Sequence, residues 1–407
     1  MTDVTFPHHH IRPAQGWVND PNGVGFINGR WHVFFQHNPH SPRHHRVGWG
    51  HWSSSDLVSW TRHPHALMPR PCTLDAEGCW SGSLVVDNGT PTLCYTAVAD
   101  HARDGVGLIA RGSDDLETWT PAEAASAPRH GGPTDETRDP FPFTFNGKRY
   151  IIQGFGGVQG EAQVLVYDAE DLTDWKLLGP LLTIQDPIAR EVADATIWEC
   201  PNLLQVDGEW VLVLSLWRWN GTQGVLSGVR WLAGDLEATA EGPRFRPRTG
   251  GVMDEGPAFY APQCASDGNR VLCWGWSWEL GRDDAWLDAH GWAGVLTTPR
   301  VLTMHDGRLH AAPAPEYLQR EAHPLADAWA CEEAPCFEVL AEGDCTVECS
   351  EVDGGTDRVQ LPAGARLLVD GSLIEVFSDG TPMTDRIYPR PGASWRVTGS
   401  ASARALR

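Results

Sequence analysis

Basic residues and long apolar runs are scarce in this chain of 407 residues. Lysine and arginine together number 31, against 53 aspartates and glutamates, and the formal net charge is −22. Nucleic acids and anionic membranes bind basic surfaces, so neither is expected as a partner. No stretch approaches the length that spans a bilayer, and residues 1–8 lack the basic segment and apolar run of a signal peptide. These absences predict a soluble cytoplasmic protein that acts on a neutral small molecule.

Cysteine and histidine show no spacing typical of a metal site. The ten cysteines are scattered without repeated CxxC pairs, which favours reduced thiols over a disulfide framework. Cys345 and Cys349 form too isolated a pair to indicate zinc. The histidine clusters at 8–10 and 44–45 are interpreted as solvated loop residues rather than as metal ligands.

Long amphipathic helical patterns are also rare, whereas strand patterns dominate. Short apolar or alternating runs stand between Gly, Asn, Asp and Pro residues. They lie at 31–35, 83–86, 149–152, 162–167, 210–214 and 270–274. Asn28-Gly29, Asn146-Gly147 and Asp207-Gly208 each precede such a run, as hairpin turns do. The sequence therefore predicts an all-β fold.

An acid followed closely by proline recurs along the chain at a near-constant interval. The four copies are Asp20-Pro21, Asp139-Pro140, Glu199-Cys200-Pro201 and Asp254-Glu255-Gly256-Pro257. The acids are 119, 60 and 55 residues apart, and half of the first gap falls on Trp80-Ser81-Gly82-Ser83, which has no acid. Such spacing is typical of a repeat architecture. We therefore expect five units, four of which carry a carboxylate at the equivalent place and direct it toward one point.

A second marker, out of phase with the first, supports this period. Asp56-Leu57-Val58-Ser59-Trp60 recurs at 115–119 and 171–175, with a degraded copy at 235–237. The tryptophans of this marker lie away from the acids, so they are interpreted as packing inside each unit. Tryptophan is abundant, at twenty residues, and it can fill a β-rich core or stack on a sugar. Stacking is the hypothesis for the tryptophans in or beside the acid-bearing motifs, which are Trp17, Trp49, Trp80 and Trp276.

Each unit holds about four strands, which matches one blade of a β-propeller. Five blades would fill residues 1–310, followed by a linker at 311–329. From residue 330 the pattern changes to short strands, and Asp370-Gly371 forms a turn between the last two. These strands predict a small antiparallel β-sandwich at 330–407. The predicted architecture is a five-bladed β-propeller followed by a small C-terminal β-sandwich.

The first strand of each propeller blade lines the central channel, so acids at equivalent places would ring one end of it. Carboxylates held together in a partly dry pocket cannot all stay ionised, and their pKa values spread. Glycoside hydrolysis uses two carboxylates in this way. Asp20 lies beside Asn19 and Asn22, whose amides are expected to lower its pKa, as suits an ionised nucleophile.

Glu199 and Asp139 have different neighbours in the sequence, which suggest different roles. Glu199 lies between Trp198 and Cys200, an apolar setting that favours the protonated form and suits a general acid. Asp139 follows Arg138, a cation that is expected to keep it charged. Asp139 is therefore expected to bind hydroxyl groups rather than to donate protons.

Several motifs together resemble the ordered signature of glycoside hydrolase family 32, whose members are invertases, β-fructofuranosidases, inulinases and levanases. They lie at 17–23, 35–39, 49–51, 80–83, 138–140, 198–201, 259–263, 274–276 and 291–300. The segment 370–377 resembles a marker of the C-terminal β-sandwich of that family. The resemblance spans about residues 8 to 380 and is specific, because many separate motifs occur in the same order.

The resemblance implies a five-bladed propeller with a β-sandwich and a retaining mechanism. It implies Asp20 as the nucleophile, Glu199 as the acid/base and Asp139 as a stabiliser of the transition state through fructose hydroxyls. Arg138 would assist at the same sugar. The residues implied in the fructose pocket are Asn19, Gln36, Trp80 and Ser81. No metal or cofactor is implied.

Two of the departures from the family pattern, at His44 and Ala258, concern the surroundings of the pocket. His44 stands where the family usually has a tryptophan, so the outer rim of the pocket is expected to differ. Ala258 stands where many members have an aspartate, which removes a polar group expected near the leaving sugar.

The sequence thus favours a retaining exo-β-fructofuranosidase that releases fructose from sucrose or short fructo-oligosaccharides. Four alternatives stay open within the same chemistry or fold. They are a fructosyltransferase, an exo-inulinase or levanase, a sucrose-6-phosphate hydrolase, and a non-catalytic fructan-binding propeller. An inverting propeller glycosidase is disfavoured by the contexts of Asp20 and Trp80.

Overall fold

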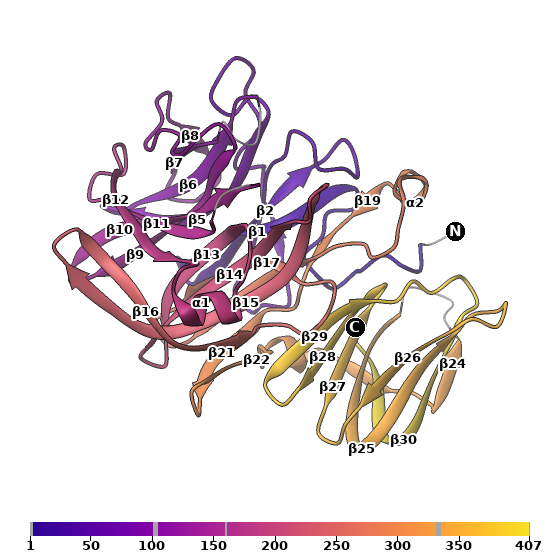
Figure 1. Ribbon diagram of the computed structural model, residues 1–407. Helices are drawn as coiled ribbons and strands as arrows, with labels where there is room; N and C mark the ends of the chain where they lie inside the picture. Colours follow the sequence, from indigo (N-terminus) through magenta and orange to yellow (C-terminus); the bar gives the residue numbers. More distant parts are fainter. Residues whose placement is uncertain (1–2, 101–104, 159–160, 331–334, 407) are drawn as a thin grey trace.

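Two β-rich parts lie side by side in the molecule, a larger ring of sheets and a smaller C-terminal sandwich (Figure 1). The computed structural model describes residues 3–100, 105–158, 161–330 and 335–406. Among the helices of these residues, none is long and apolar enough to cross a membrane. The nine cysteines that these residues include are all free thiols.

The ring consists of five blades of four main strands each. Blade 1 holds β1 (Gly16–Ile27), β2 (Arg30–Asn38), β3 (Gly48–Ser54) and β4 (Thr61–Arg62). Blade 2 holds β5 (Gly78–Asp87), β6 (Thr90–Val98), β7 (Val106–Gly112) and β8 (Trp119–Pro121). Blade 3 holds β9 (Asp135–Phe145), β10 (Lys148–Gly157), β11 (Gln163–Asp168) and β12 (Lys176–Thr183). Blade 4 holds β13 (Ile197–Val206), β14 (Glu209–Trp219), β15 (Gly224–Thr239) and β16 (Gly242–Val252). Blade 5 holds β17 (Tyr260–Ser266), β18 (Val271–Ser277), β21 (Arg300–His305) and β22 (Arg308–Pro313).

The first strands of the blades contact one another around a closed ring. β1 contacts β5, β5 contacts β9, β9 contacts β13, β13 contacts β17, and β17 contacts β1. The short strand β19 (Trp292–Ala293) pairs in parallel with β1 through Gly16 and Trp17, and this joins the last blade to the first. The sequence-based prediction of a five-bladed propeller is confirmed, and its first strands are the ones that face the channel.

A few short elements connect the blades. Helix α1 (Pro187–Val192) begins after Asp186, whose side chain accepts the N–H groups of Ile188 and Ala189. Helix α2 (Asp284–His290) ends at Gly291, which has the left-handed backbone that suits glycine there. Strand β20 (Val295–Leu296) pairs with β18.

Every first strand shifts its register at the place where the sequence repeats its acid or its equivalent. The shifts lie at 18–21 in β1, 80–82 in β5, 138–141 in β9, 199–202 in β13 and 260–263 in β17. A bulge redirects a side chain, and proline is tolerated there because it has no N–H to give to the ladder. Four of the shifts contain a proline, namely Pro21, Pro140, Pro201 and Pro262. Three of the four copies of the acid–proline pattern, at Asp20, Asp139 and Glu199, therefore mark bulges on the strands that face the channel.

The three full copies of the second marker, Asp-Leu-x-x-Trp, each form a turn before the outermost strand of a blade, whereas the degraded copy at 235–237 lies within β15. In one copy Asp115 accepts the N–H of Glu117 at 3.1 Å, and the indole N–H of Trp119 donates to the carbonyl of Leu116 at 3.1 Å. The tryptophans of the marker pack against three different hydrophobic clusters, Trp60 in blade 1, Trp119 in blade 2 and Trp175 in blade 3. Their interpretation as packing residues is confirmed.

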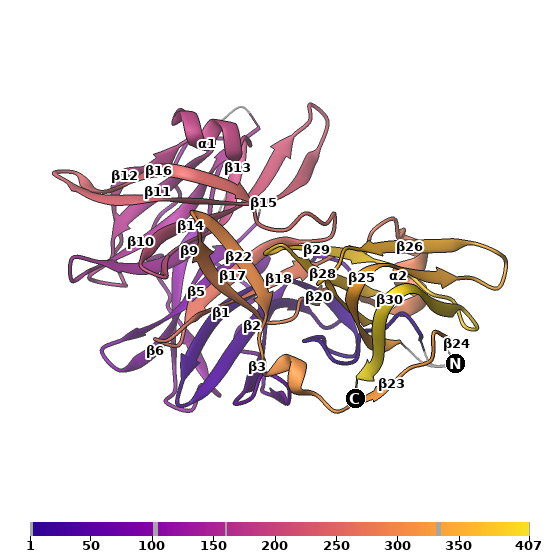
Figure 2. The ribbon, with the colours of Figure 1, turned by 90° about the horizontal axis from the view of Figure 1, so that it is seen from below.

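The C-terminal part is built around two long strands, β25 (Cys336–Ser350) and β30 (Ser394–Leu406). β25 shifts register between Ala341 and Cys345, so its first half pairs with β27 (Arg366–Asp370) and its second half with β26 (Thr356–Leu361). Strands β28 (Leu373–Ser378) and β29 (Thr381–Arg386) extend the sheet and lie against β22 of blade 5 (Figures 1 and 2). Val347, Leu367 and Trp395 are buried in the core between the layers. The predicted C-terminal β-sandwich is confirmed.

The segment expected as a linker, 311–329, carries structure of its own. It contains the last residues of β22, the 3-10 helix η2 (Tyr317–Gln319) and strand β23 (Ala322–Pro324), and β24 (Ala328–Ala330) begins within it. β23 and β24 both pair with β30. We keep the division at 1–310, 311–329 and 330–407 as a proposal, in which the connecting segment packs with the second domain.

Asp254, the fourth acid of the recurring pattern, lies away from the channel. Its carboxylate accepts hydrogen bonds from Arg300 at 2.7 Å and from the hydroxyl and N–H of Thr384 at 2.6 and 2.9 Å. The expectation that four carboxylates converge is therefore wrong for Asp254. The reason is its place in the chain, because it precedes β17 in a segment that the second domain covers.

Arg300 is fully buried and also binds Glu375 at 2.8 Å, which joins the two domains. His10, from the N-terminal segment, contacts Asp370 at 2.7 Å and Glu375 at 3.1 Å. Burial disfavours the charged imidazole, but hydrogen bonds with both carboxylates outweigh it and raise the pKa of His10. The interpretation of residues 8–10 as solvated is thus wrong for His10, whose partners lie some 360 residues further along the chain.

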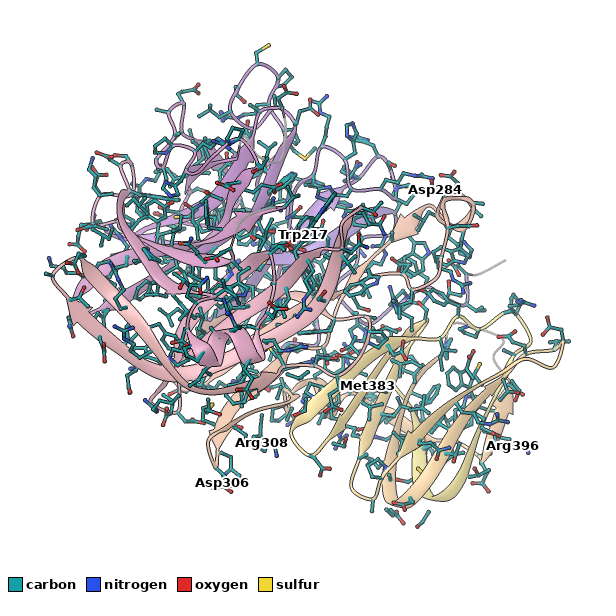
Figure 3. The ribbon with its side chains drawn as sticks, in the orientation of Figure 1. Trp217, Asp284, Asp306, Arg308, Met383 and Arg396 are labelled. Carbon is teal, nitrogen blue, oxygen red and sulfur yellow. The ribbon has the colours of Figure 1, made fainter. Side chains whose placement is uncertain are left out.

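Replacing Arg300 by methionine should lower the free energy of unfolding by about 3–5 kcal/mol, because Asp254 and Glu375 would remain buried without their cation. Urea unfolding followed by tryptophan fluorescence measures this change. The control is Arg308→Met near the exposed tip of the β21–β22 hairpin (Figure 3), which should change stability by less than about 0.5 kcal/mol. Equal losses in the two variants would contradict a structural role for this network.

Candidate active site

Asp20 lies at the bulge of β1 and is held by neutral donors. The hydroxyl of Ser81 donates to it at 2.5 Å, the amide of Asn19 at 3.0 Å and the amide of Gln36 at 3.3 Å. Burial raises the pKa of Asp20, and the bonds from Ser81 and Asn19 only partly oppose this effect. The expectation of a lowered pKa is therefore wrong, because the cost of burial comes from surrounding blades that the local sequence does not reveal.

Asp139 lies at the bulge of β9 with a left-handed backbone, φ 60°. The backbone N–H of Cys200 donates to its carboxylate at 2.8 Å, and its own N–H donates to the hydroxyl of Thr96 at 2.8 Å. Burial raises the pKa of Asp139 to about 7, although the neighbouring charge of Arg138 opposes the rise. The expectation that Arg138 keeps Asp139 charged is therefore wrong near neutral pH. A non-glycine residue in this conformation carries strain, which concentrates at functional sites.

Glu199 lies at the bulge of β13 and has polar partners on both oxygens. Arg138 donates to one oxygen at 2.8 Å, and the phenol of Tyr260 donates to the other at 2.8 Å. The neighbour Trp198 is fully buried in the core of the blade, as expected from the alternation of side chains along a strand. The apolar setting expected from the sequence thus belongs to Trp198, and the carboxylate of Glu199 meets a cation and a phenol.

The three carboxylates meet in the channel. Cys200 links two of them, because its N–H binds Asp139 and its sulfur lies 3.6 Å from Asp20. The charge of Glu199 raises the pKa of both aspartates, and that of Asp20 also raises the pKa of Asp139. Since the three charges oppose one another, the site retains a proton more readily than separate carboxylates would.

Aromatic rings surround this group of acids. The guanidinium of Arg138 lies 5.1 Å from the ring of Trp80. His44 contacts Trp80 and Trp17 edge to face, and Trp17 in turn packs on Trp276 with ring centres 5.6 Å apart. The structure brings together the expected pocket residues Trp17, Asn19, Gln36, Trp80, Ser81, Arg138 and Trp276.

Trp49 is the exception among the expected pocket residues. Its side chain is fully buried in the cluster between blades 1 and 2, and its indole N–H donates to the carbonyls of Cys79 and Trp80. No face of the ring is open to a sugar, so its assignment to the pocket is wrong. The motif that contains Trp49 lies on β3, two strands away from the channel.

Tyr260 is a site residue that the sequence analysis did not single out. The repeat spacing could have identified it, because Tyr260 lies 61 residues after Glu199, the residue that it contacts. The contacts from Ser81 to Asp20, from Cys200 to Asp139 and from Arg138 to Glu199 span the same distance in sequence. Tyr260, rather than Asp254, therefore occupies the equivalent place in blade 5.

The two departures from the family pattern have different positions. His44 lies at the rim, exposed to solvent, where its ring is 3.3 Å from the amide oxygen of Gln36. An imidazole thus replaces the usual indole there. Ala258 is fully buried, and its N–H donates to the carbonyl of Thr384 in the second domain. Its side chain is therefore removed from solvent, and its backbone serves the domain contact.

A group of histidines in blade 1 has ring nitrogens within 4.8 Å of one another, namely His32, His51 and His63. Both nitrogens of His63 have partners, Ser53 at 2.7 Å and Glu117 at 2.7 Å. His32 and His51 bond to each other at 2.9 Å. These contacts describe a hydrogen-bonded stack on β2 and β3, and none of them reaches the three carboxylates.

Comparison with known proteins gives consistent matches. The profile of the glycosyl hydrolases family 32 N-terminal domain matches residues 10–313. A sucrose-6-phosphate hydrolase from Klebsiella pneumoniae is 33% identical, covering 78% of this chain and 69% of that protein. A raffinose invertase from Escherichia coli is 30% identical, covering 95% of this chain and 80% of that protein.

Solved structures share the fold. A family 32 β-fructofuranosidase from Bombyx mori superposes with a TM-score of 0.80 at 23% identity, over 99% of this chain and 94% of that chain. A sucrose-6-phosphate hydrolase from Lactobacillus gasseri also gives a TM-score of 0.80 at 23% identity, over 99% of this chain and 93% of that chain. The chain therefore belongs to glycosyl hydrolase family 32, and it is a glycoside hydrolase that acts on fructosides.

Proposed function

We propose that this protein is a retaining exo-β-fructofuranosidase that releases fructose from sucrose and short fructo-oligosaccharides. One observation carries the proposal. Asp20 and Glu199 lie on first strands of non-adjacent blades, yet Cys200, next to Glu199, contacts Asp20 at 3.6 Å. Two carboxylates that approach one point from different blades can act on opposite sides of one glycosidic bond, as double displacement requires.

In the first step an oxygen of Asp20 forms a bond to C2 of the terminal fructosyl unit. The bond between C2 and the leaving oxygen breaks, and Glu199 gives that oxygen its proton. In the second step Glu199 takes a proton from water, whose oxygen attacks C2 and releases Asp20 as a carboxylate. Arg138 and Tyr260 orient Glu199 through both steps, and Ser81 orients Asp20. Asp139 is proposed to bind fructose hydroxyls as charge develops on the ring.

Sucrose 6-phosphate is the second candidate substrate, because several relatives are named as its hydrolases. The kcat/KM values for sucrose, sucrose 6-phosphate, 1-kestose, inulin and levan separate the candidates. We expect one of the two disaccharides to exceed both polymers by about tenfold or more, which corresponds to about 1.4 kcal/mol of transition-state binding. A preference for inulin or levan would contradict the proposal and favour an exo-inulinase or levanase.

Hydrolysis rather than transfer is also part of the proposal. Free fructose measured against oligosaccharides after incubation with dilute sucrose tests it directly. Oligosaccharides as the main product would support a fructosyltransferase instead. A cytoplasmic location, in keeping with the scattered cysteines, completes the proposal.

Ser81→Ala should reduce kcat/KM by about 10–100-fold, because the hydroxyl bond that orients and stabilises the Asp20 carboxylate is lost. That bond lowers the pKa of Asp20, so its loss should move the acid limb of the pH profile to higher pH. The control is Ser83→Ala, two residues further on β5, whose hydroxyl accepts from Gln263 instead. An unmoved acid limb in Ser81→Ala would show that Ser81 does not tune the nucleophile.

A further inference from the structure

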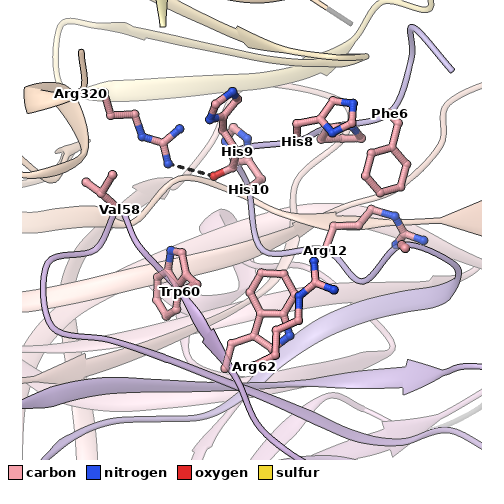
Figure 4. A pocket seen from close by; sticks show the side chains of 12 residues that line it. Phe6, His8, His9, His10, Arg12, Val58, Trp60, Arg62 and Arg320 are labelled. Carbon is pink, nitrogen blue, oxygen red and sulfur yellow. Dashed lines mark hydrogen bonds between the residues drawn. The ribbon is translucent and has the colours of Figure 1, made fainter. Parts of the chain in front are cut away.

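A cavity of about 570 Å³ lies on the outer edge of blade 1, away from the channel (Figure 4). The N-terminal segment forms one wall, the β3–β4 region forms another, and Arg320 closes it from the segment that leads to the second domain. Sites for small molecules commonly have volumes of this order. The three carboxylates lie on bulges of strands that face the channel, so this cavity is separate from the site described above.

The lining is basic, although the chain as a whole carries a net charge of −22. Three arginines and three histidines line the cavity, and no aspartate or glutamate is among its lining residues. They are Arg12, Arg62, Arg320, His8, His9 and His10. Two carboxylates lie beside these histidines. Asp370 accepts their three backbone N–H groups at 2.9, 2.7 and 3.1 Å, and Glu375 contacts the ring of His10 at 3.1 Å. The three arginines form no ion pair among the described residues, so the pocket favours an anion.

Arg320 lines this cavity, and its guanidinium is only partly hydrogen-bonded. Its side chain is 7% exposed, its guanidinium lies 4.2 Å from the ring of Tyr317, and one NH2 group donates to the carbonyl of His9 at 3.0 Å. Its Nε and its other NH2 group have no hydrogen-bond partner among the described residues. Buried donors without partners are unfavourable, and the fork of a guanidinium fits the oxygens of a phosphate.

Arg62 and Trp60 lie across the cavity from Arg320 (Figure 4). Arg62 is exposed, and its guanidinium lies 4.8 Å from the ring of Trp52. It forms no ion pair with any carboxylate in the described residues. Trp60 is half-buried, packing on the core of blade 1 while it also lines the cavity. The indole of Trp60 can stack on an organic ring while the guanidinium groups of Arg62 and Arg320 bind a phosphate.

We propose that this cavity is a second binding site, which takes a small organic phosphate monoester. Arg320 and Arg62 bind the phosphate oxygens, and Trp60 stacks on the organic ring. A sugar phosphate and a nucleotide share this chemistry. Binding would draw together the N-terminal segment, blade 1 and the segment at Arg320.

Isothermal titration of the full chain with glucose 6-phosphate and with AMP tests the proposal, and glucose and adenosine serve as neutral controls. Saturating fructose is kept in the cell, so that the central site does not contribute and the result is independent of the proposed function. We expect one of the phosphates to bind one site per chain and its neutral control not to bind. Which phosphate binds distinguishes the sugar from the nucleotide source.

Arg320→Gln should weaken that binding by about tenfold or more, whereas Arg308→Gln on the β21–β22 hairpin should leave it unchanged. If Arg320→Gln does not fold, the exposed Arg62→Gln carries the same test, with an expected loss of about threefold or more. No binding of either phosphate at about 10 mM, or unchanged binding in the folded arginine variants of the cavity, would overturn the proposal.

Discussion

Asp20→Ala should abolish release of fructose from sucrose, with kcat falling by about five orders of magnitude. The carboxylate is the proposed nucleophile, and no other group in the site is placed by Ser81 and Asn19 for the same attack. The protein should remain folded, because burial raises the pKa of Asp20 and the substitution removes a buried carboxylate. Initial rates with sucrose, together with thermal unfolding of the same sample, measure both effects.

Glu199→Ala should also abolish turnover of sucrose, but for a different reason. The proposed loss is of the proton for the leaving oxygen, so a fructosyl fluoride, whose leaving group needs little protonation, should still react in the first step. Asp20→Ala should turn over neither substrate. The control is Asp194→Ala, an exposed residue beyond α1, which should behave as wild type. Activity near wild type in either active-site variant would refute the assigned mechanism.

Asp139→Asn should make the protein more stable and much less active. Turnover should fall by about 10²–10⁴-fold, because the amide cannot carry the negative charge that favours the transition state. The pKa of Asp139 is raised by burial to about 7, from an ordinary value of 3.8. The folded state therefore binds the proton more tightly than the unfolded state does.

The sign of the stability change follows from this difference. A raised carboxyl pKa costs no stability below about pH 4, where the group is protonated in both states, and its cost grows until pH passes about 7. Asparagine avoids that cost, so the variant should gain up to about 4 kcal/mol above pH 7 and almost nothing at pH 4. Thermal unfolding as a function of pH measures the gain. The control is Asp306→Asn, exposed at the β21–β22 hairpin (Figure 3), and a gain of similar size there would contradict the argument.

The propeller could be predicted because its causes are local and repeated. The turn before the outermost strand uses the Asp-Leu-x-x-Trp marker in blades 1, 2 and 3, and a bulge on each first strand tolerates a proline. Both patterns therefore recur at the period of the blade. The same period also leads to Tyr260, once the contacts that span 61 residues are known. Asp254 lies a few residues before Tyr260, which holds the equivalent position in blade 5. Asp254 therefore lies at the domain contact instead of in the channel.

The electrostatics of the site could not be predicted from neighbours in the sequence. Along a strand, successive side chains point to opposite faces, so the apolar surroundings of Trp198 do not indicate the surroundings of Glu199. Burial of Asp20 and Asp139 comes from blades far away in the chain, and it outweighs the amides and the cation beside them. The prediction that Trp49 lines the pocket is wrong for another reason, because a motif shared by a family can contain packing residues as well as binding residues.

The attachment of the N-terminal segment has a consequence for the order of assembly during synthesis. His10 leaves the ribosome before the blades do, but the carboxylates of Asp370 and Glu375 follow some 360 residues later. β1 likewise waits for β19 before the ring can close. The first blades can form as they emerge, but the edge of β1 stays unpaired until β19 has been made. During that interval the open edge can pair with wrong partners. The segment around His10 is thus fastened late, although it is made before any of the blades.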